Sequence, residues 1–270
     1  MSKFTPEQNR KFWNEYASKS KNSYFGAHSD KHIVELENRF IISELKSRKT
    51  ANLLDIGCGN GQRTLLFSKY VDNHTVGIDY SEKMIQEAKT LLSKNDKATN
   101  NLSFEVCDIH DFSKKMSFDV IISCRCFINQ PSHKEQIKLF ELLHEKLLPG
   151  GSLIIAEVSV EGIKNLNSLR RKFGLNPINI RWNNLQINEN IVFSKIKDLY
   201  RIKKINRLGM FYYISRVLHP TLVYPDEPQP NTKLNELAMK TEILFQNEST
   251  KTKNSFEKIG AHLLVHFKKK

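Results

Sequence analysis

The stretch Leu53–Arg63, LLDIGCGNGQR, places Gly57, Gly59 and Gly61 at alternate positions directly after an apolar run. An apolar run, a glycine-rich loop and a helical pattern in that order predict a strand, a tight turn and a helix N-terminus. Glycines let a ligand approach the backbone, and the first turn of a helix offers unpaired N–H groups. The stretch therefore predicts a ligand-binding loop at the edge of a parallel sheet.

The loop departs from the dinucleotide-binding pattern G-x-G-x-x-G, because Gln62 stands where the third glycine belongs. An acid, Asp55, lies two residues before the first glycine. A carboxylate there repels a pyrophosphate but suits a cationic amino group or a sulfonium. The loop is thus expected to hold a ligand that carries positive charge.

Around this loop, short apolar runs alternate with amphipathic stretches. The runs NLLDI, HTVGID, LSFEVC, FDVIISC and SLIIAEV fall between residues 52 and 158. This alternation predicts an α/β domain with a mainly parallel sheet and helices on both faces. Two helices are expected before it, within residues 1–48. A helix near 191–199, a strand near 207–215, a helix near 234–245 and a final strand HLLVHF are expected after it, with irregular segments at 161–190 and 219–233.

Acidic residues follow two of the expected strands. Asp79 ends the second run, where an acid can bind both hydroxyls of a ribose or can cap the helix that starts near Ser81. Asp108 follows the third run, where it can accept from an adenine amino group or can be an ordinary turn residue. The fourth run leads into the loop RCFINQP at the same edge, where open α/β sheets bind ligands.

These elements, in this order, resemble the motifs of class I S-adenosylmethionine-dependent methyltransferases: LLDIGCGNG, VGIDYS, CDIHDF and FDVIIS with LLPGGSLIIAE. The likeness covers roughly residues 13–157 and returns in HLLVHF. It implies a Rossmann-like fold with a seven-stranded, mainly parallel sheet, S-adenosyl-L-methionine as cofactor and S-adenosyl-L-homocysteine as product. We expect an N-terminal helical lid (1–50), a cofactor-binding core (51–158), a substrate-cap insert (159–188), a core continuation (189–216), a second insert (217–258) and the final strand (259–270).

The resemblance also implies roles for single residues. The three glycines would underlie the methionine moiety and the ribose, Asp79 would hold the ribose hydroxyls, and Asp55 would orient the amino group. Trp13 and Tyr16 match an FWxxYA helix that closes over the cofactor, or else they are ordinary packing residues of the first helix. The residues expected at the cofactor are Trp13, Tyr16, Asp55, Gly57, Gly59, Gly61, Asp79, Tyr80, Met84, Asp108, Ile109 and Cys124.

The loop after the fourth strand bears on the methyl acceptor. It reads SCRC where enzymes that methylate exocyclic base nitrogens have [DNS]-P-P-[FY]. RNA carbon-5 enzymes use a cysteine that directly follows a proline, and neither cysteine of this loop does. Both kinds of nucleic-acid methyltransferase are therefore disfavoured. SCRCFINQPSHKEQ is similar to a subgroup of small-molecule methyltransferases that is associated with surface-polysaccharide and other sugar pathways. That similarity implies a small polar acceptor.

Residue chemistry adds candidates for the acceptor site. Arginine presents a planar set of donors to a carboxylate or phosphate, and a histidine can take a proton near neutral pH. Each candidate has a structural alternative: an arginine bonded to its own loop, a tyrosine in the core, or a histidine at the surface. The candidates are Arg125 and Arg216 for an anionic acceptor, Asn129, Tyr212 and Tyr213 for its pocket, and His133 or His219 as general base.

The composition of the 270 residues sets broader bounds. The net charge of +13 favours a polyanionic partner, but the lysines are scattered and the longest basic run is Lys268–Lys270, so nucleic acid is an unlikely partner. No apolar run matches a signal peptide or a membrane span, which favours a cytoplasmic protein. The four cysteines lack zinc-ligand spacing and are expected to be reduced core thiols, with no metal. An RNA methyltransferase and a non-catalytic cofactor-binding module are the alternatives; the oligomeric state is not predicted.

Overall fold

The computed structural model describes residues 4–19, 30–95, 101–112, 116–246 and 255–270. Its centre is a seven-stranded sheet in the order β3-β2-β1-β4-β5-β7-β6, in which only β7 runs antiparallel to its neighbours. This confirms the expected Rossmann-like methyltransferase sheet. The strands are β1 (Leu53–Ile56), β2 (Thr75–Asp79), β3 (Leu102–Val106), β4 (Phe118–Cys124), β5 (Leu147–Val158), β6 (Tyr200–Arg207) and β7 (His262–Lys269).

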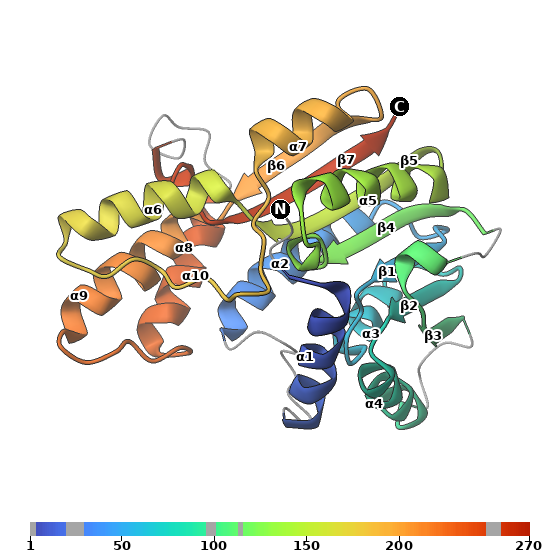
Figure 1. Ribbon diagram of the computed structural model, residues 1–270, viewed down its shortest axis with the longest axis horizontal. Coiled ribbons are helices and arrows are strands. Elements are labelled where there is room, and N and C mark those ends of the chain that lie inside the picture. Colours follow the sequence, from blue (N-terminus) through green and yellow to red (C-terminus); the bar gives the residue numbers. More distant parts are fainter. Residues whose placement is uncertain (1–3, 20–29, 96–100, 113–115, 247–254) are drawn as a thin grey trace.

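Helices cover both faces of the sheet (Figure 1). One face packs against α5 and α7, the other against α2 and α3, while α6, α8, α9 and α10 gather at one end of the molecule (Figure 1). The helices are α1 (Pro6–Lys19), α2 (Lys31–Leu45), α3 (Gln62–Ser68), α4 (Glu82–Ser93), α5 (His133–Lys146), α6 (Val160–Lys172), α7 (Glu189–Ile196), α8 (Gly209–Tyr213), α9 (His219–Val223) and α10 (Lys233–Gln246), with short helical turns η1 (Ile109–Asp111), η2 (Phe127–Asn129) and η3 (Ile214–Leu218).

The two N-terminal helices have different positions. In α2, Ile33, Leu36 and Phe40 are buried in the hydrophobic cluster on one face of the sheet. Apolar residues three and four apart form one face of a helix, and burial of that face holds α2 to the core. Helix α1, in contrast, contributes Asn9, Arg10 and Trp13 to the cavity described below. The sequence also predicts an aromatic loop, NSYFGAHSD (22–30), between the two helices; of this loop only Asp30 is among the described residues.

The strand expected at 207–215 is wrong. The strand ends at Arg207, and the apolar run after it forms α8 and η3. A short apolar run does not distinguish a buried strand from a buried helix, and here burial on all sides decides for the helix. The backbone N–H of Phe211 donates to the buried Glu242 carboxylate at 2.9 Å. That acceptor satisfies one of the free N–H groups at the start of α8.

The irregular structure expected over 161–190 is found only in its second part. Ser159 caps α6 by accepting from the Gly162 N–H at 3.0 Å, and the helix continues to Lys172. Serine at this position is a standard helix start that the sequence reading missed.

Within the described ranges, no helix is both long and apolar enough to span a bilayer, and no group of three or more His, Cys, Asp and Glu side chains is arranged to hold a metal ion. The four cysteines are free thiols, of which Cys58 is buried.

Candidate active site

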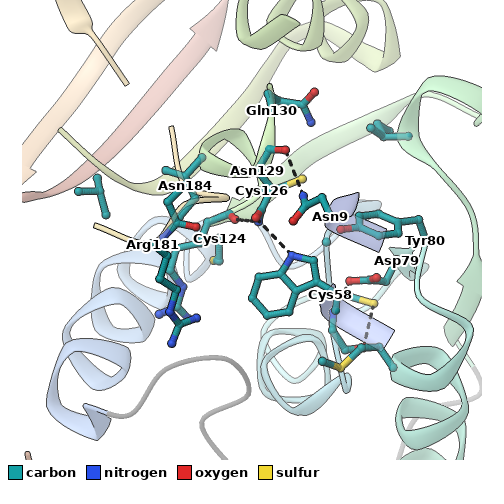
Figure 2. A pocket seen from close by; sticks show the side chains of 18 of the residues that line it. Asn9, Cys58, Asp79, Tyr80, Cys124, Cys126, Asn129, Gln130, Arg181 and Asn184 are labelled. Atoms are coloured by element: carbon teal, nitrogen blue, oxygen red, sulfur yellow. Dashed lines mark hydrogen bonds between the residues drawn. The ribbon is translucent and has the colours of Figure 1, made fainter. Parts of the chain in front are cut away.

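A cavity of about 890 Å³ lies at the edge of the sheet where the parallel strands end. Its wall is built by the glycine loop, the ends of β2 and β4, helix α1 and the segment 178–186. Figure 2 shows Asp79, Tyr80 and Cys58 on one side of it and Arg181 and Asn184 on the other, with Asn129 between them. The cavity thus joins the predicted cofactor loop to three of the predicted acceptor residues, Arg125, Asn129 and Tyr212.

All three glycines of the loop have positive φ, but Gly59 and Gly61 have different roles. At Gly59 (φ 54°) an added Cβ would meet nothing within 4 Å, and this residue lines the cavity. At Gly61 (φ 77°) an added Cβ would lie 2.7 Å from Ala88 and from the Phe104 ring. Gly59 therefore leaves room for a ligand, whereas Gly61 lets α3 pack closely on its neighbours.

Asp79 links the loop to the next helix. Its Oδ2 accepts from the Gly59 N–H at 3.0 Å, and its Oδ1 accepts from the Ser81 N–H at 2.8 Å. The side chain that caps α4 is Ser81, which accepts from the Met84 N–H. Burial raises the pKa of Asp79 to about 6. Each carboxylate oxygen accepts more than one hydrogen bond, so Asp79 retains acceptor capacity toward the cavity.

Asp55 is a second buried acid in the wall of the cavity. Its Oδ2 accepts from the Thr64 hydroxyl at 2.7 Å, and burial raises its pKa to about 6. Two carboxylates next to the glycine loop make this end of the cavity suitable for hydroxyl donors and for a cation.

Helix α1 closes over the cavity through side-chain contacts. Trp13 Nε1 donates to Asn129 Oδ1 at 3.3 Å, and Asn9 Nδ2 donates to the Asn129 carbonyl at 3.2 Å. The Arg10 guanidinium lies 5.5 Å from the centre of the Tyr80 ring. Tyr16, whose ring packs 5.5 Å from that of Trp13, is not among the described residues that line the cavity.

Two arginines in the cavity wall, Arg63 and Arg125, lie against one carboxylate, Glu37, that is buried behind the wall. Arg63 NH1 donates to Glu37 Oε2 at 2.8 Å, and Arg125 NH2 lies 3.9 Å from the same oxygen. Burial alone raises the pKa of Glu37, but the two guanidinium groups hold it well below its ordinary value. Among the described residues, Arg63 NH2 and Arg125 NH1 are buried and have no hydrogen-bond partner. Two guanidinium groups therefore share one carboxylate here, and Arg63 also lies close enough to Asp55 to act on its pKa.

Arg125 also has an unusual backbone, with φ 60°. Its N–H donates to the Ala156 carbonyl on β5 at 2.9 Å. A non-glycine residue in the left-handed region costs roughly 1–2 kcal/mol, so surrounding contacts must hold it there. Such strain is typical of functional positions.

Tyr212 and His262 line the same part of the cavity. The Tyr212 hydroxyl and His262 Nδ1 are hydrogen bonded at 2.5 Å, and His262 Nε2 lies 3.1 Å from Glu37 Oε1. His262 is not among the residues predicted from the sequence. It starts the antiparallel strand β7, and the start of an antiparallel strand lies at the edge where the parallel strands end. That position is the signal that could have identified it.

Several candidates lie elsewhere in the described structure. Arg216 pairs with Asp30 at 2.6 Å, and His133 Nδ1 contacts Gln136 Oε1 at 2.9 Å in the first turn of α5. His219 is buried, and burial lowers its pKa. The predicted site residues that are not among the described lining residues are Tyr16, Gly61, His133, Tyr213, Arg216 and His219. The predicted residues that do line the cavity are Trp13, Asp55, Gly57, Gly59, Asp79, Tyr80, Met84, Asp108, Ile109, Cys124, Arg125, Asn129 and Tyr212.

Comparison with known proteins agrees with this geometry. A family model described as a methyltransferase domain matches residues 47–207. An uncharacterized protein of Rickettsia prowazekii is 31% identical over 45% of the chain and 48% of its own length, so the match spans about half of that relative. The phosphoethanolamine N-methyltransferase of Plasmodium falciparum is 31% identical over 43% of the chain and 42% of its own length. The crystal structure of the magnesium protoporphyrin IX methyltransferase of Synechocystis PCC 6803 with bound S-adenosylhomocysteine shares the fold, with a TM-score of 0.61 and 14% identity over 98% of this chain and 99% of that one.

Proposed function

Because the chain belongs to the methyltransferase-domain family, whose cofactor is S-adenosylmethionine, we propose that it methylates an oxygen or nitrogen atom of a small, polar, anionic acceptor. When bound, the cofactor supplies an electrophilic methyl group on a sulfonium. The observation that carries the proposal is the single cavity that runs from Gly59 and Asp79 to Arg125.

The first end of this cavity fits the cofactor. The open space at Gly59 admits a ligand beside the backbone, and the oxygens of Asp79 suit the hydroxyls of a ribose. Asp55 suits the amino group of the methionine moiety. Tyr80, Met84, Asp108 and Ile109 line the part of the cavity that would hold the adenine.

The second end suits an anion. A buried donor without a partner costs about 1–3 kcal/mol, and Arg63 NH2 and Arg125 NH1 are two such donors. A phosphate or carboxylate on the acceptor would pair with the exposed parts of the two guanidinium groups, whose side chains are 14% and 16% exposed and line the cavity. The name of the Plasmodium relative gives a small phosphorylated acceptor for that protein. A phosphorylated or sugar-linked precursor, such as one for a surface polysaccharide, is the acceptor that we propose for this chain.

Helix α1 would keep water out of the reaction. Methyl transfer is an in-line displacement, so the protein mainly positions the two reactants in a dry site. The contacts of Asn9 and Trp13 with Asn129 hold α1 across the loop after β4. This arrangement suits a closed pocket for a small molecule better than an open groove for RNA.

The test is transfer of a labelled methyl group from S-adenosylmethionine in a lysate of the source cell. The acid-soluble, RNA and protein fractions are counted separately, with a Gly59→Ala variant as the control for a blocked cofactor loop. We expect label in the acid-soluble fraction and a product one methylene heavier than its acceptor. Label in RNA would refute the small-molecule acceptor. Binding of S-adenosylhomocysteine without transfer to any fraction would indicate a non-catalytic module.

A further inference from the structure

Three side chains from distant parts of the chain form a line from the cavity wall into the core. Tyr212 comes from α8, His262 from the start of β7 and Glu37 from α2. The hydroxyl of the tyrosine lies 2.5 Å from His262 Nδ1, and His262 Nε2 lies 3.1 Å from the carboxylate. Tyr212 and His262 line the cavity, whereas Glu37 is fully buried behind them.

The charge on Glu37 determines where the protons lie. Arg125 and Arg63 hold the pKa of Glu37 well below its ordinary value despite its burial, so the group is a carboxylate that only accepts hydrogen bonds. A carboxylate beside Nε2 favours the tautomer that carries the proton on this nitrogen, although the 3.1 Å contact does not have hydrogen-bond geometry. In neutral imidazole Nδ1 is then an acceptor, and it receives the hydrogen bond of the Tyr212 hydroxyl. The lone pairs of the tyrosine oxygen are left for a donor in the cavity.

We propose that Tyr212 takes the proton of an acceptor hydroxyl and passes its own proton to His262, so that the acceptor is an alcohol. This inference rests on the proposed function. As the new oxygen–methyl bond forms, the sulfur–methyl bond breaks and its electron pair stays on sulfur. The hydroxyl proton moves to the Tyr212 oxygen, the Tyr212 proton moves to His262 Nδ1, and Glu37 faces the resulting imidazolium. The proton later leaves His262 for solvent. An amine acceptor needs no such relay, because it already has a nucleophilic lone pair.

The charges around the relay support a concerted transfer. Burial raises the pKa of Tyr212 well above its ordinary value, so a standing tyrosinate does not form. The positive charges of Arg216 and Arg125 lower the pKa of the tyrosine, and the negative charges of Asp30 and Glu37 raise it. The tyrosine thus works by exchanging one proton for another. The order of groups, a hydroxyl, a histidine and a carboxylate that orients the histidine, is the same as in a Ser-His-Asp triad.

Another buried tyrosine shows what a structural hydroxyl looks like in this fold. Tyr200 is 3% exposed, against 6% for Tyr212, and its hydroxyl donates to the Phe140 carbonyl at 2.9 Å. Its bond ends at a carbonyl that does not titrate, away from the described lining of the cavity. Tyr200→Phe is therefore a matched control that removes an equally buried hydroxyl.

The first experiment measures methyl transfer with an acid-soluble extract of the source cell as acceptor. Tyr212→Phe is expected to lower turnover by about 100-fold or more while its Kd for S-adenosylhomocysteine stays at the wild-type value. Tyr200→Phe is expected to keep wild-type turnover. The acid limb that a histidine proton acceptor gives the pH–rate profile is expected to vanish in Tyr212→Phe. Wild-type turnover in Tyr212→Phe would overturn the inference and leave the proposed function standing, whereas no transfer by the wild type would refute both.

The second experiment combines turnover of a His262 variant with a spectrum that needs no acceptor. His262→Asn replaces Nδ1 by an amide oxygen that accepts from Tyr212 but takes no proton, so the variant should fold and bind S-adenosylhomocysteine yet lose turnover as Tyr212→Phe does. In the ¹⁵N spectrum of histidine-labelled protein, the signals lost in His262→Asn identify this residue. We expect the neutral form with the proton on Nε2. A proton on Nδ1 would overturn the relay whatever the acceptor is.

Discussion

The two jobs of the glycine loop can be separated by two alanine substitutions. At Gly61 the new Cβ would lie 2.7 Å from Ala88 Cβ and 2.7 Å from Phe104 Cζ, where real contacts are not found. Overpacking costs about 1–3 kcal/mol and the left-handed backbone about 1–2 kcal/mol, so Gly61→Ala should lower the free energy of unfolding by about 2–5 kcal/mol. At Gly59 the Cβ meets nothing, so Gly59→Ala should cost only the backbone term of about 1–2 kcal/mol. That Cβ enters the cavity, however, and should weaken cofactor binding.

Urea unfolding and calorimetric titration with S-adenosylhomocysteine measure the two effects. Gly77→Ala is the control for packing alone, because its Cβ would meet the same Phe104 ring at 2.7 Å and Gly77 has no positive φ. Its cost should be about 1–3 kcal/mol, with the Kd unchanged. We expect the larger loss of stability in Gly61→Ala and the larger loss of affinity in Gly59→Ala. Equal destabilisation by both, or wild-type affinity in Gly59→Ala, would refute the division of roles.

Four further predictions concern the two buried acids, the acceptor site and helix α1. The affinity for S-adenosylhomocysteine should fall as the pH drops through about 6, because burial raises the pKa of Asp79 and Asp55 to about 6 and protonation removes hydrogen-bond acceptors. Calorimetric titration between pH 5 and 8 checks this. An equally steep fall in affinity in Asp79→Asn would count against a role for Asp79. Because the pKa of each acid is higher in the folded protein than the ordinary value of 3.8, ionisation of these acids lowers the free energy of unfolding. This loss of stability is complete above about pH 6 and disappears as the pH falls toward 3.8. Urea unfolding of the ligand-free protein at several pH values measures it. Arg125→Lys should raise the acceptor KM about tenfold with the cofactor Kd unchanged, since lysine lacks the planar set of donors, and an unchanged KM would remove Arg125 from the acceptor site. In Trp182→Phe, which leaves Trp13 as the remaining tryptophan, S-adenosylhomocysteine should change the emission spectrum, and an unchanged spectrum would show that α1 does not close over the cofactor.

The cofactor half of the site was predictable because it depends on local patterns. An apolar run fixes where a strand ends, and parallel strands bring their carboxyl ends to one edge. Gly59, Asp79 and Asp108 follow three such runs, and all three line the cavity. No knowledge of distant contacts was needed to bring them together.

The acceptor half depends on contacts that no local pattern reveals. Glu37 lies on a helix whose apolar spacing shows only that it packs on the core, and His262 lies at the far end of the chain. His133 and His219 were candidates because a histidine can take a proton near neutral pH, but neither is among the described residues that line the cavity. Arg216 has a carboxylate partner, Asp30, from residues whose proximity the sequence does not show.

The charged groups that would bind an anionic acceptor are therefore different residues from those that give the chain its net charge. The net charge of +13 comes largely from scattered lysines, whose attraction for any anion is screened by salt over about 8 Å. The positive charge at the cavity comes from two guanidinium groups that share one buried carboxylate, Glu37, and of which Arg63 also lies near Asp55. A buried charge is screened far less and acts over the few ångströms of a bound ligand. Because Glu37 also faces His262, the same carboxylate balances the anion-binding arginines and sets the tautomer of the proposed relay, so that binding and proton transfer are coupled through one residue.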